Sequence, residues 1–287
     1  MKSDFLIMKL MGGLGNQMFQ VAAASKIAQE SRREFLLDVS WYQNRNQADA
    51  HDSIPHVLQF PFLRDRRTIE SPTFTSKFSK LAFRLGLTGS RNSSFMERNL
   101  EYSPDFQIPL HCRTYEGYFQ SLKFIPEMKT VETIFEWPSN SHSSDFPTEY
   151  GKTSVALHLR LGDYVNSKIH HISNKEYIES AVRIIKDKQF VEEIRVFTDS
   201  PHLVHEYLPR GIHDHIRIAE IKPNPIEQLR EIASFPHLIG SSSSFSWWAG
   251  YMNPCGLEKT VIVPSFILRG RRFVYPEMRF PITWHVI

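Results

Sequence analysis

The sequence predicts an α/β protein whose two halves each contain a parallel sheet flanked by helices. Three observations support this fold class. The chain opens with an apolar strand, a glycine-rich turn and a helix, which begin a βαβ unit. From Ser154 onward, short apolar strands alternate with helical patterns at the spacing of a parallel sheet. Between these two regular parts lies a long segment without a sustained period.

The first half is expected to begin with a strand from Phe5 to Leu10. The glycine-rich turn at residues 11–15 follows, then a helix over Asn16–Ser31 and a second strand over Phe35–Asp38. From about residue 38 to residue 150 the pattern predicts helices and long loops, with a basic segment near Lys77–Arg91.

Pro, Ser and His gather in Pro138–Tyr150, which is the best candidate for a linker. We therefore expect two domains, residues 1–150 and 151–287.

The sequence of the second half predicts strands that alternate with capped helices. The expected strands are Ser154–Leu159, Ile194–Thr198, Ile216–Ala219, His237–Gly240 and a final one at Thr260–Pro264. The expected helices are one opened by a capping box with Ser173 at the cap and Glu176 three residues later, then Pro201–Leu208, Asn224–Ser234 and Ser244–Met252.

Composition restricts the class of protein. The chain has 287 residues, 41% of them hydrophobic, and a formal net charge of +3, which is too mild to imply nucleic acid. It suits a small anionic substrate or loose contact with an acidic membrane surface. The two cysteines, Cys112 and Cys255, indicate free thiols in a reducing compartment. Because no run of about 18 apolar residues occurs, we expect a cytoplasmic protein, at most peripheral to the inner membrane face.

The most informative motif is His158-x-Arg160-x-Gly162-Asp163-Tyr164, directly after an apolar run. Ligands of α/β folds bind beyond the carboxyl ends of strands, and arginine grips diphosphates with paired hydrogen bonds. Arg160 is therefore a candidate phosphate ligand, with His158 on the same side of the strand and Asp163 as a candidate general base. The alternative is an ordinary strand end with a structural Arg–Asp pair.

A second motif, Gly12-Gly13-Leu14-Gly15-Asn16-Gln17, could bring backbone close to a phosphate at a helix N-terminus. Asn16 and Gln17 could point into the same cleft. It is no dinucleotide fingerprint, because Met18 occupies the place of the third glycine, and no P-loop lysine follows. The alternative is a tight turn that needs positive φ.

Two further motifs follow later strands. Asp199 could accept hydrogen bonds from a purine edge, or it could cap the helix that starts at Pro201. The run Ser241–Trp248 places hydroxyls and free N–H groups at a helix start, which suits an anion, although a serine-rich cap would look the same.

A metal site is not expected. The tightest histidine pairs, His170-His171 and His213-x-His215, lack acidic or cysteine partners at ligand spacing. No Asp-x-Asp follows a strand, so a metal-chelating nucleotide-sugar site is not supported.

Together these motifs resemble the α1,2-fucosyltransferases of glycosyltransferase family 11, over essentially the whole chain. The segments that carry the resemblance are Gly12–Gln20, Gly117–Ser121, His158–Tyr164 and Ser243–Trp248. The resemblance implies a GT-B-like fold, with two Rossmann-like domains facing a central cleft. It implies GDP-fucose as donor, inversion at the fucose C1, a β-galactoside acceptor and no metal.

The resemblance also implies roles for individual residues. Arg160 would hold the β-phosphate, Asp199 would read guanine and His158 would lie near the nucleotide. Gly13 and Gly15 would let the opposite domain close on the diphosphate. The other expected donor contacts are Asn16, Gln17, Ser243, Ser244 and Phe245. Leu161 stands where the family often has a second arginine, which leaves Arg160 alone.

Other functions are compatible with parts of this pattern. A fucosyltransferase of another linkage, such as α1,6, would use the same donor site. A non-catalytic nucleotide- or glycan-binding protein is disfavoured by the intact His158, Arg160 and Asp163 set, and a dehydrogenase by the missing third glycine. The acceptor would be a galactose-terminated glycan, such as a surface polysaccharide, bound by the segment from Trp41 to Phe124.

Overall fold

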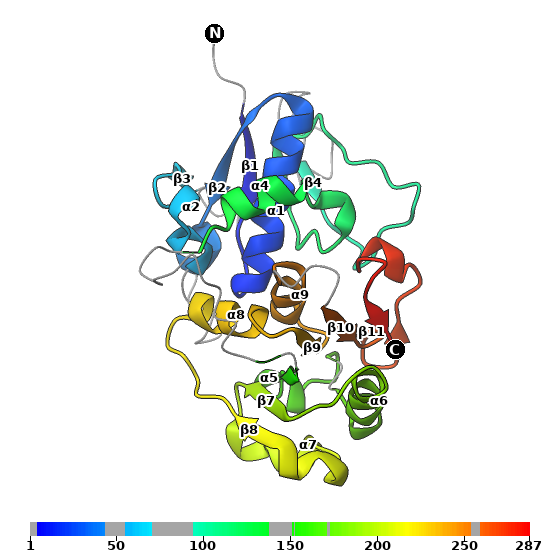
Figure 1. The fold of residues 1–287 in the computed structure, drawn as a ribbon. Helices are drawn as coiled ribbons and strands as arrows, with labels where there is room; N and C mark the ends of the chain where they lie inside the picture. The colour runs from blue at the N-terminus through cyan, green and yellow to red at the C-terminus, as the bar shows by residue number, and fades with distance from the viewer. Residues whose placement is uncertain are drawn as a thin grey trace. The chain divides into compact units, whose positions relative to one another are not determined.

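The computed structural model describes residues 5–43, 55–70, 94–137, 151, 153–170, 173–253 and 259–287 (Figure 1). The chain divides into two compact units, Met1–Pro138 (unit 1) and Ser139–Ile287 (unit 2). The expected linker, which contains the expected domain boundary, and the basic segment near Lys77–Arg91 lie outside the described residues.

Unit 1 contains a five-stranded parallel sheet with the strand order β3-β2-β1-β5-β4. Its strands are β1 Phe5–Lys9, β2 Glu34–Asp38, β3 Thr68–Ile69, β4 Ser94–Met96 and β5 Thr114–Glu116. The first two confirm the expected strands. The expectation of helices and loops alone between residues 38 and 150 is wrong, because β3, β4 and β5 lie there. These strands are two or three residues long, too short to show a hydrophobic period.

The long helix of unit 1, α1 (Leu14–Ser31), confirms the predicted helix and starts two residues earlier. Three consecutive alanines, Ala22–Ala24, are fully buried and favour the helical conformation, and α1 contacts β1 and β2. Shorter helical segments complete the unit: η1 Ser40–Gln43, η2 His56–Gln59, α2 Pro61–Arg64, η3 Leu122–Phe124 and α4 Met128–Ile134.

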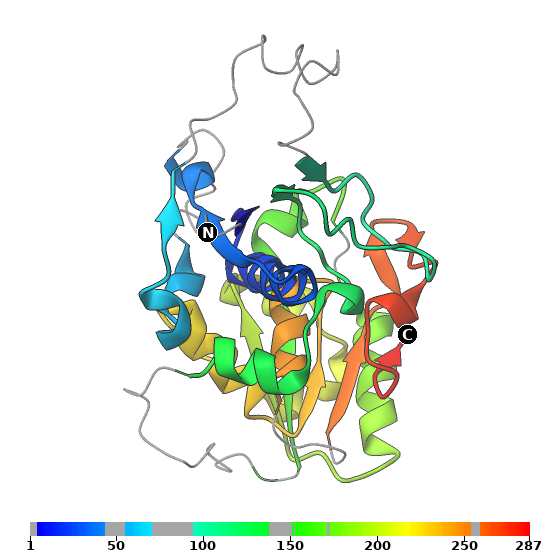
Figure 2. The ribbon, with the colours of Figure 1, turned by 90° about the horizontal axis from the view of Figure 1, so that it is seen from above.

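Unit 2 contains a six-stranded parallel sheet with the order β13-β10-β9-β6-β7-β8. Its strands are β6 Ser154–Leu159, β7 Glu193–Thr198, β8 Ile216–Ile218, β9 His237–Ile239, β10 Thr260–Val263 and β13 His285–Val286. All six residues of β6 are buried, as expected for a central parallel strand. Figure 2 shows strands of this sheet side by side, with α6 beside them. The expectation that the strand at Thr260 is the last is wrong, because β13 follows it, as does the hairpin of β11 (Phe266–Leu268) and β12 (Arg271–Arg272).

The helical segments of unit 2 follow its strands. They are α5 Gly162–Val165, α6 Lys175–Lys186, η4 Pro201–Leu203, α7 Val204–Tyr207, η5 Arg210–His215, α8 Pro225–Ala233, α9 Ser244–Tyr251 and η7 Pro276–Met278. The predicted Asn224 cap of α8 is confirmed. The predicted Ser173 cap of α6 is wrong: Asn174 accepts the hydrogen bond from Tyr177 N, and Ser173 is buried.

Each sheet has one point at which its strand order reverses. In unit 1 the chain leaves β1 toward β2 and β3 and later builds β5 and β4 on the other side. In unit 2 it leaves β6 toward β7 and β8 and later builds β9, β10 and β13 on the other side. Ligands of open parallel sheets bind beyond the carboxyl ends of the strands at this switch point. We therefore expect ligand sites at the loops after β1 and β5 and at the loops after β6 and β9.

The predicted α/β class is confirmed, with two Rossmann-like units that each contain a parallel sheet and flanking helices. Among the described helices, none has the length and apolar character needed to cross a membrane.

Candidate active site

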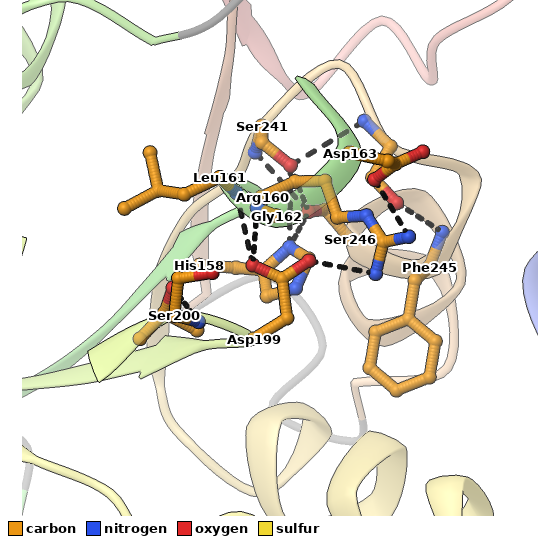
Figure 3. Close-up of polar contacts among 12 residues, drawn as sticks. His158, Arg160, Leu161, Gly162, Asp163, Asp199, Ser200, Ser241, Phe245 and Ser246 are labelled. Carbon is orange, nitrogen blue, oxygen red and sulfur yellow. Dashed lines mark hydrogen bonds and ion pairs between the residues drawn. The ribbon is translucent and has the colours of Figure 1, made fainter. Parts of the chain in front are cut away.

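Two loops meet at the switch point of unit 2. The arginine loop, residues 160–163, follows β6, and the serine loop, residues 241–244, follows β9. Two of the sequence motifs are thus neighbours in space (Figure 3).

Arg160 is held by two carboxylates. Its Nη2 lies 2.9 Å from Asp163 Oδ1, and its Nη1 lies 2.9 Å from Asp199 Oδ2. The Arg160 side chain is 32% exposed, so the guanidinium is oriented by protein groups and still accessible. Its Cζ also lies 5.8 Å from the centre of the Tyr164 ring. The structural Arg–Asp pair of the alternative interpretation is therefore present. It fixes a cation at the switch point of the sheet, where ligands of open parallel sheets generally bind.

Asp199 braces the arginine loop from the neighbouring strand. Its Oδ1 accepts hydrogen bonds from Leu161 N at 3.0 Å and Gly162 N at 2.9 Å, while Oδ2 pairs with Arg160 (Figure 3). Burial by itself would raise the pKa of Asp199, but these hydrogen bonds and the charge of Arg160 outweigh it and lower the pKa below its usual value. The helix-capping alternative is wrong, because the carboxylate bonds to this loop and not to the helix at Pro201.

The position of the Asp199 carboxylate explains why residue 162 is a glycine. A Cβ on Gly162 would lie 2.9 Å from Asp199 Oδ2 and 3.1 Å from its Cγ. A side chain there would displace the carboxylate that holds Arg160.

His158 lies inside unit 2 and ties the two loops together. Its Nδ1 lies 2.5 Å from Ser246 Oγ and 3.2 Å from Ser241 Oγ (Figure 3). His158 is 8% exposed, and the centre of its ring is 5.6 Å from that of Phe245. Burial, followed by the positive charge of Arg160, lowers the pKa of His158 to about 4. The imidazole is therefore neutral near pH 7 and acts as a hydrogen-bonding partner of the serines.

Several polar groups of the serine loop form hydrogen bonds within unit 2. Ser243 Oγ caps α9 by accepting from Phe245 N at 3.2 Å, and Ser241 N donates to Ser246 Oγ at 3.1 Å. Ser242 Oγ donates to Phe266 O. Ser244 is the first residue of α9. The serine-rich cap is therefore present, and it sets the N-terminus of α9 beside His158. Ser246 is a member of this site that the motif contained but sequence reasoning did not single out.

In unit 1, the glycine turn (residues 11–15) lies at the end of β1. Gly12 has a φ of 73°, and a Cβ there would lie 2.7 Å from Asn16 Nδ2, so the position requires glycine. Gly13 is the N-cap of α1, and its carbonyl oxygen accepts from Asn16 N and Gln17 N. Gly15 is buried within the first turn of α1.

The two polar residues after these glycines are placed differently. Gln17 is fully buried: its Nε2 donates to Gly12 O at 2.8 Å, and its Oε1 accepts from Val57 N at 2.9 Å. It thus fixes the turn from inside unit 1. Asn16 Oδ1 accepts from Gln120 Nε2 at 2.6 Å, which connects the glycine turn to the loop after β5.

Glu97 accepts hydrogen bonds from Tyr118 N and Phe119 N in the loop after β5. The sequence did not predict this role, because Glu97 lies in an irregular stretch about twenty residues before these partners. The described residues contain no group of three or more His, Cys, Asp and Glu side chains that could hold a metal ion.

Comparison with known proteins decides the family. The model of glycosyl transferase family 11 matches residues 5–287. The chain belongs to glycosyltransferase family 11.

Individual relatives are more distant. An alpha-1,2-colitosyltransferase of Escherichia coli is 23% identical over 286 residues, covering 90% of this chain and 91% of that protein. Among solved structures, the fucosyltransferase NodZ from Bradyrhizobium matches with a TM-score of 0.46 and 16% identity, covering 88% of this chain and 94% of NodZ. POFUT1 in complex with GDP matches with a TM-score of 0.45 and 14% identity, covering 91% of this chain and 98% of POFUT1. Membership of the family makes the protein a glycosyltransferase.

Proposed function

We propose that this glycosyltransferase moves L-fucose from GDP-fucose to the 2-hydroxyl of a β-galactoside, with inversion at the fucose C1. The observation that carries the proposal is Arg160, oriented by two carboxylates at the switch point of unit 2 and still accessible. The family and the α1,2 linkage in the name of the E. coli relative support the reaction type and the linkage.

The chemistry is a single displacement. The galactose O2 forms a bond to C1 as the bond from C1 to the β-phosphate oxygen breaks, and the electron pair of that bond leaves with GDP. Negative charge grows on the phosphate in the transition state, where Arg160 stabilises it more than in the ground state. No metal is needed in this proposal, because the guanidinium supplies the positive charge.

Asp163 is the proposed base that takes the proton from the galactose 2-hydroxyl. Its side chain is 43% exposed and pairs with Arg160 at 2.9 Å. A departing diphosphate would compete for the same guanidinium. Donor binding would therefore release Asp163 from its present partner and free its carboxylate to accept a proton.

The remaining residues support Arg160 and the nucleotide. We assign Asp199 to positioning, because its two oxygens hold the arginine loop and Arg160, and its contact with guanine stays a prediction of the family resemblance. His158, neutral and bonded to Ser246, would hold the arginine and serine loops in fixed positions relative to each other. The donor contacts of Gly13, Gly15, Asn16, Ser243, Ser244 and Phe245 also stay predictions. Gln17 has no exposed surface, so we assign it to support of the glycine turn.

A second candidate donor is GDP-colitose, because the E. coli relative is named for transfer of colitose. Colitose lacks the 3-hydroxyl of fucose, so one enzyme site could discriminate between them by a single hydrogen bond. An α1,6 linkage and a non-catalytic binding role are the other outcomes of the same test.

The test is transfer by the purified protein from GDP-fucose or GDP-colitose to lactose and N-acetyllactosamine, with and without EDTA, with the linkage mapped by NMR. An α1,2-fucosyl product formed in EDTA supports donor, linkage and metal independence together. Transfer from GDP-colitose alone would mean that GDP-colitose, and not GDP-fucose, is the donor. An α1,6 product would mean that the proposed α1,2 linkage is wrong. Absence of GDP binding by calorimetry would overturn the proposal as a whole.

A further inference from the structure

The switch point of unit 1 carries a second preorganised loop. The tyrosine loop, residues 117–121, follows β5 and is tied to α1 and the glycine turn. Gln20 Nε2 donates to Gly117 O at 2.9 Å, while Gln20 Oε1 accepts from Met11 N at 3.0 Å. Gln120 also donates to Asn16 in the first turn of α1. These hydrogen bonds join the loop after β1 to the loop after β5, and β1 and β5 are adjacent strands of the sheet.

This loop is held in a strained backbone conformation. Phe119 has a φ of 52°, which is uncommon for a bulky residue, and its side chain is fully buried. Such strain persists only where the surroundings over-determine it, and it clusters at ligand sites.

Glu97 is the group that holds the strained segment. Its Oε2 accepts from Tyr118 N at 2.5 Å, and its Oε1 accepts from Phe119 N at 3.1 Å and from the Tyr102 hydroxyl at 2.6 Å. Burial and the neighbouring Glu97 carboxylate raise the pKa of Tyr102, so the phenol stays protonated and donates. A Cβ on Gly117 would lie 2.4 Å from Glu97 Cβ, so the loop and the glutamate fit only with glycine there.

The chemistry of the tyrosine loop suits a neutral ligand. The loop contains no charged residue, and both oxygens of Glu97 accept hydrogen bonds within unit 1. Tyr118 is 36% exposed, and Gln120 in the same loop carries an amide whose Nε2 donates to Asn16 Oδ1. An exposed aromatic ring on such a loop suits a sugar, because ring faces attract the C–H groups of a pyranose and an amide can also bond a sugar hydroxyl.

We propose that the tyrosine loop is a sugar-binding surface, with Tyr118 in contact with the sugar and Glu97 as the residue that positions it. The identification of this sugar with the acceptor rests on the proposed function. Glu97 acts through Tyr118 and Phe119, and not on the reacting atoms.

The test compares Glu97→Gln and Tyr118→Ala with a matched control, Glu116→Gln. Glu116 is a carboxylate of the adjoining strand whose partner is Lys9, at 3.1 Å, on the surface. Saturation-transfer NMR with a panel of neutral methyl glycosides and lactose measures sugar binding directly, and calorimetry measures GDP affinity in the same proteins.

We expect at least one neutral sugar to bind the wild type, and both Glu97→Gln and Tyr118→Ala to weaken it about tenfold. GDP affinity should stay within about twofold, and Glu116→Gln should match the wild type in both measurements. If transferase activity is present, the acceptor KM should rise in Glu97→Gln while the donor KM does not.

Two results would overturn the proposal: no neutral sugar binds the wild type, or Tyr118→Ala, which keeps the backbone bond to Glu97, binds sugar as tightly as the wild type. If Glu97→Gln fails to fold, Tyr118→Ala still decides the question. Loss of the proposed function would appear separately, as absence of GDP binding by the wild type.

Discussion

Asp199 Oδ2 lies 2.9 Å from Arg160 Nη1, while the other oxygen of the same carboxylate accepts the backbone N–H groups of Leu161 and Gly162. One side chain directly after β7 therefore fixes both the guanidinium and the backbone of the loop that carries it. The cation is set in place before any ligand arrives, which lowers the reorganisation needed in a transition state.

Arg160→Ala should lower kcat by about 100- to 1000-fold, because it removes a donor that acts on the departing phosphate. The KM for the donor should change less, since the stabilisation is greatest in the transition state. Steady-state kinetics measure this, with Arg183→Ala on the exposed face of α6 as the control. A kcat within about threefold of wild type would exclude Arg160 from charge stabilisation.

Gly162→Ala should reduce kcat/KM by at least about tenfold without unfolding the protein, because the new Cβ displaces the Asp199 carboxylate from Arg160. Gly211→Ala is the matched control, since a Cβ there meets no atom within 4 Å. Equal activity of the two variants would mean that Asp199 does not position Arg160.

The stability of the protein should depend on pH through His158. Its folded pKa is about 4, below the ordinary histidine value of 6.5, so between these values the unfolded state binds more protons. The free energy of unfolding should therefore fall as pH decreases through this window, by up to about 3 kcal/mol from this residue. Denaturant titrations of wild type and His158→Gln from pH 7 to pH 4 measure the difference. A difference that does not change with pH would contradict the buried, neutral assignment.

Asp163→Asn should lower kcat by about 100-fold or more if Asp163 is the general base, because the amide cannot accept the proton. GDP affinity, measured by calorimetry, should not fall, since in the proposed complex the diphosphate replaces residue 163 as the partner of Arg160. Retention of most of the wild-type rate would remove Asp163 from the base role.

The central strands and the motifs were predictable from the sequence, because their signals are local. β6 is a continuous apolar run, and α6 buries Tyr177, Ile178 and Ala181 at helical spacing. The arginine and serine loops were also predictable as candidates, because polar residues directly follow apolar strands.

The pairing of the motifs was not predictable, because it depends on the strand order. That β9 lies beside β6, and β5 beside β1, follows from long-range pairing that no local pattern contains. For the same reason Asp199 was separated from the arginine loop in the sequence, and its bonds to Leu161 and Gly162 appeared only in the fold. The two- and three-residue strands of unit 1 were missed because pairing with neighbours, and not propensity, makes them strands.

The short bond between His158 and Ser246 joins residues 88 positions apart in the chain. Because the ring is buried and neutral, a change at either position removes this hydrogen bond in a dry environment, where the loss is costly. Evolution should therefore treat the two positions as one unit, accepting paired replacements and rejecting single ones. A library that randomises both codons together should recover active clones in which the identities at 158 and 246 are correlated.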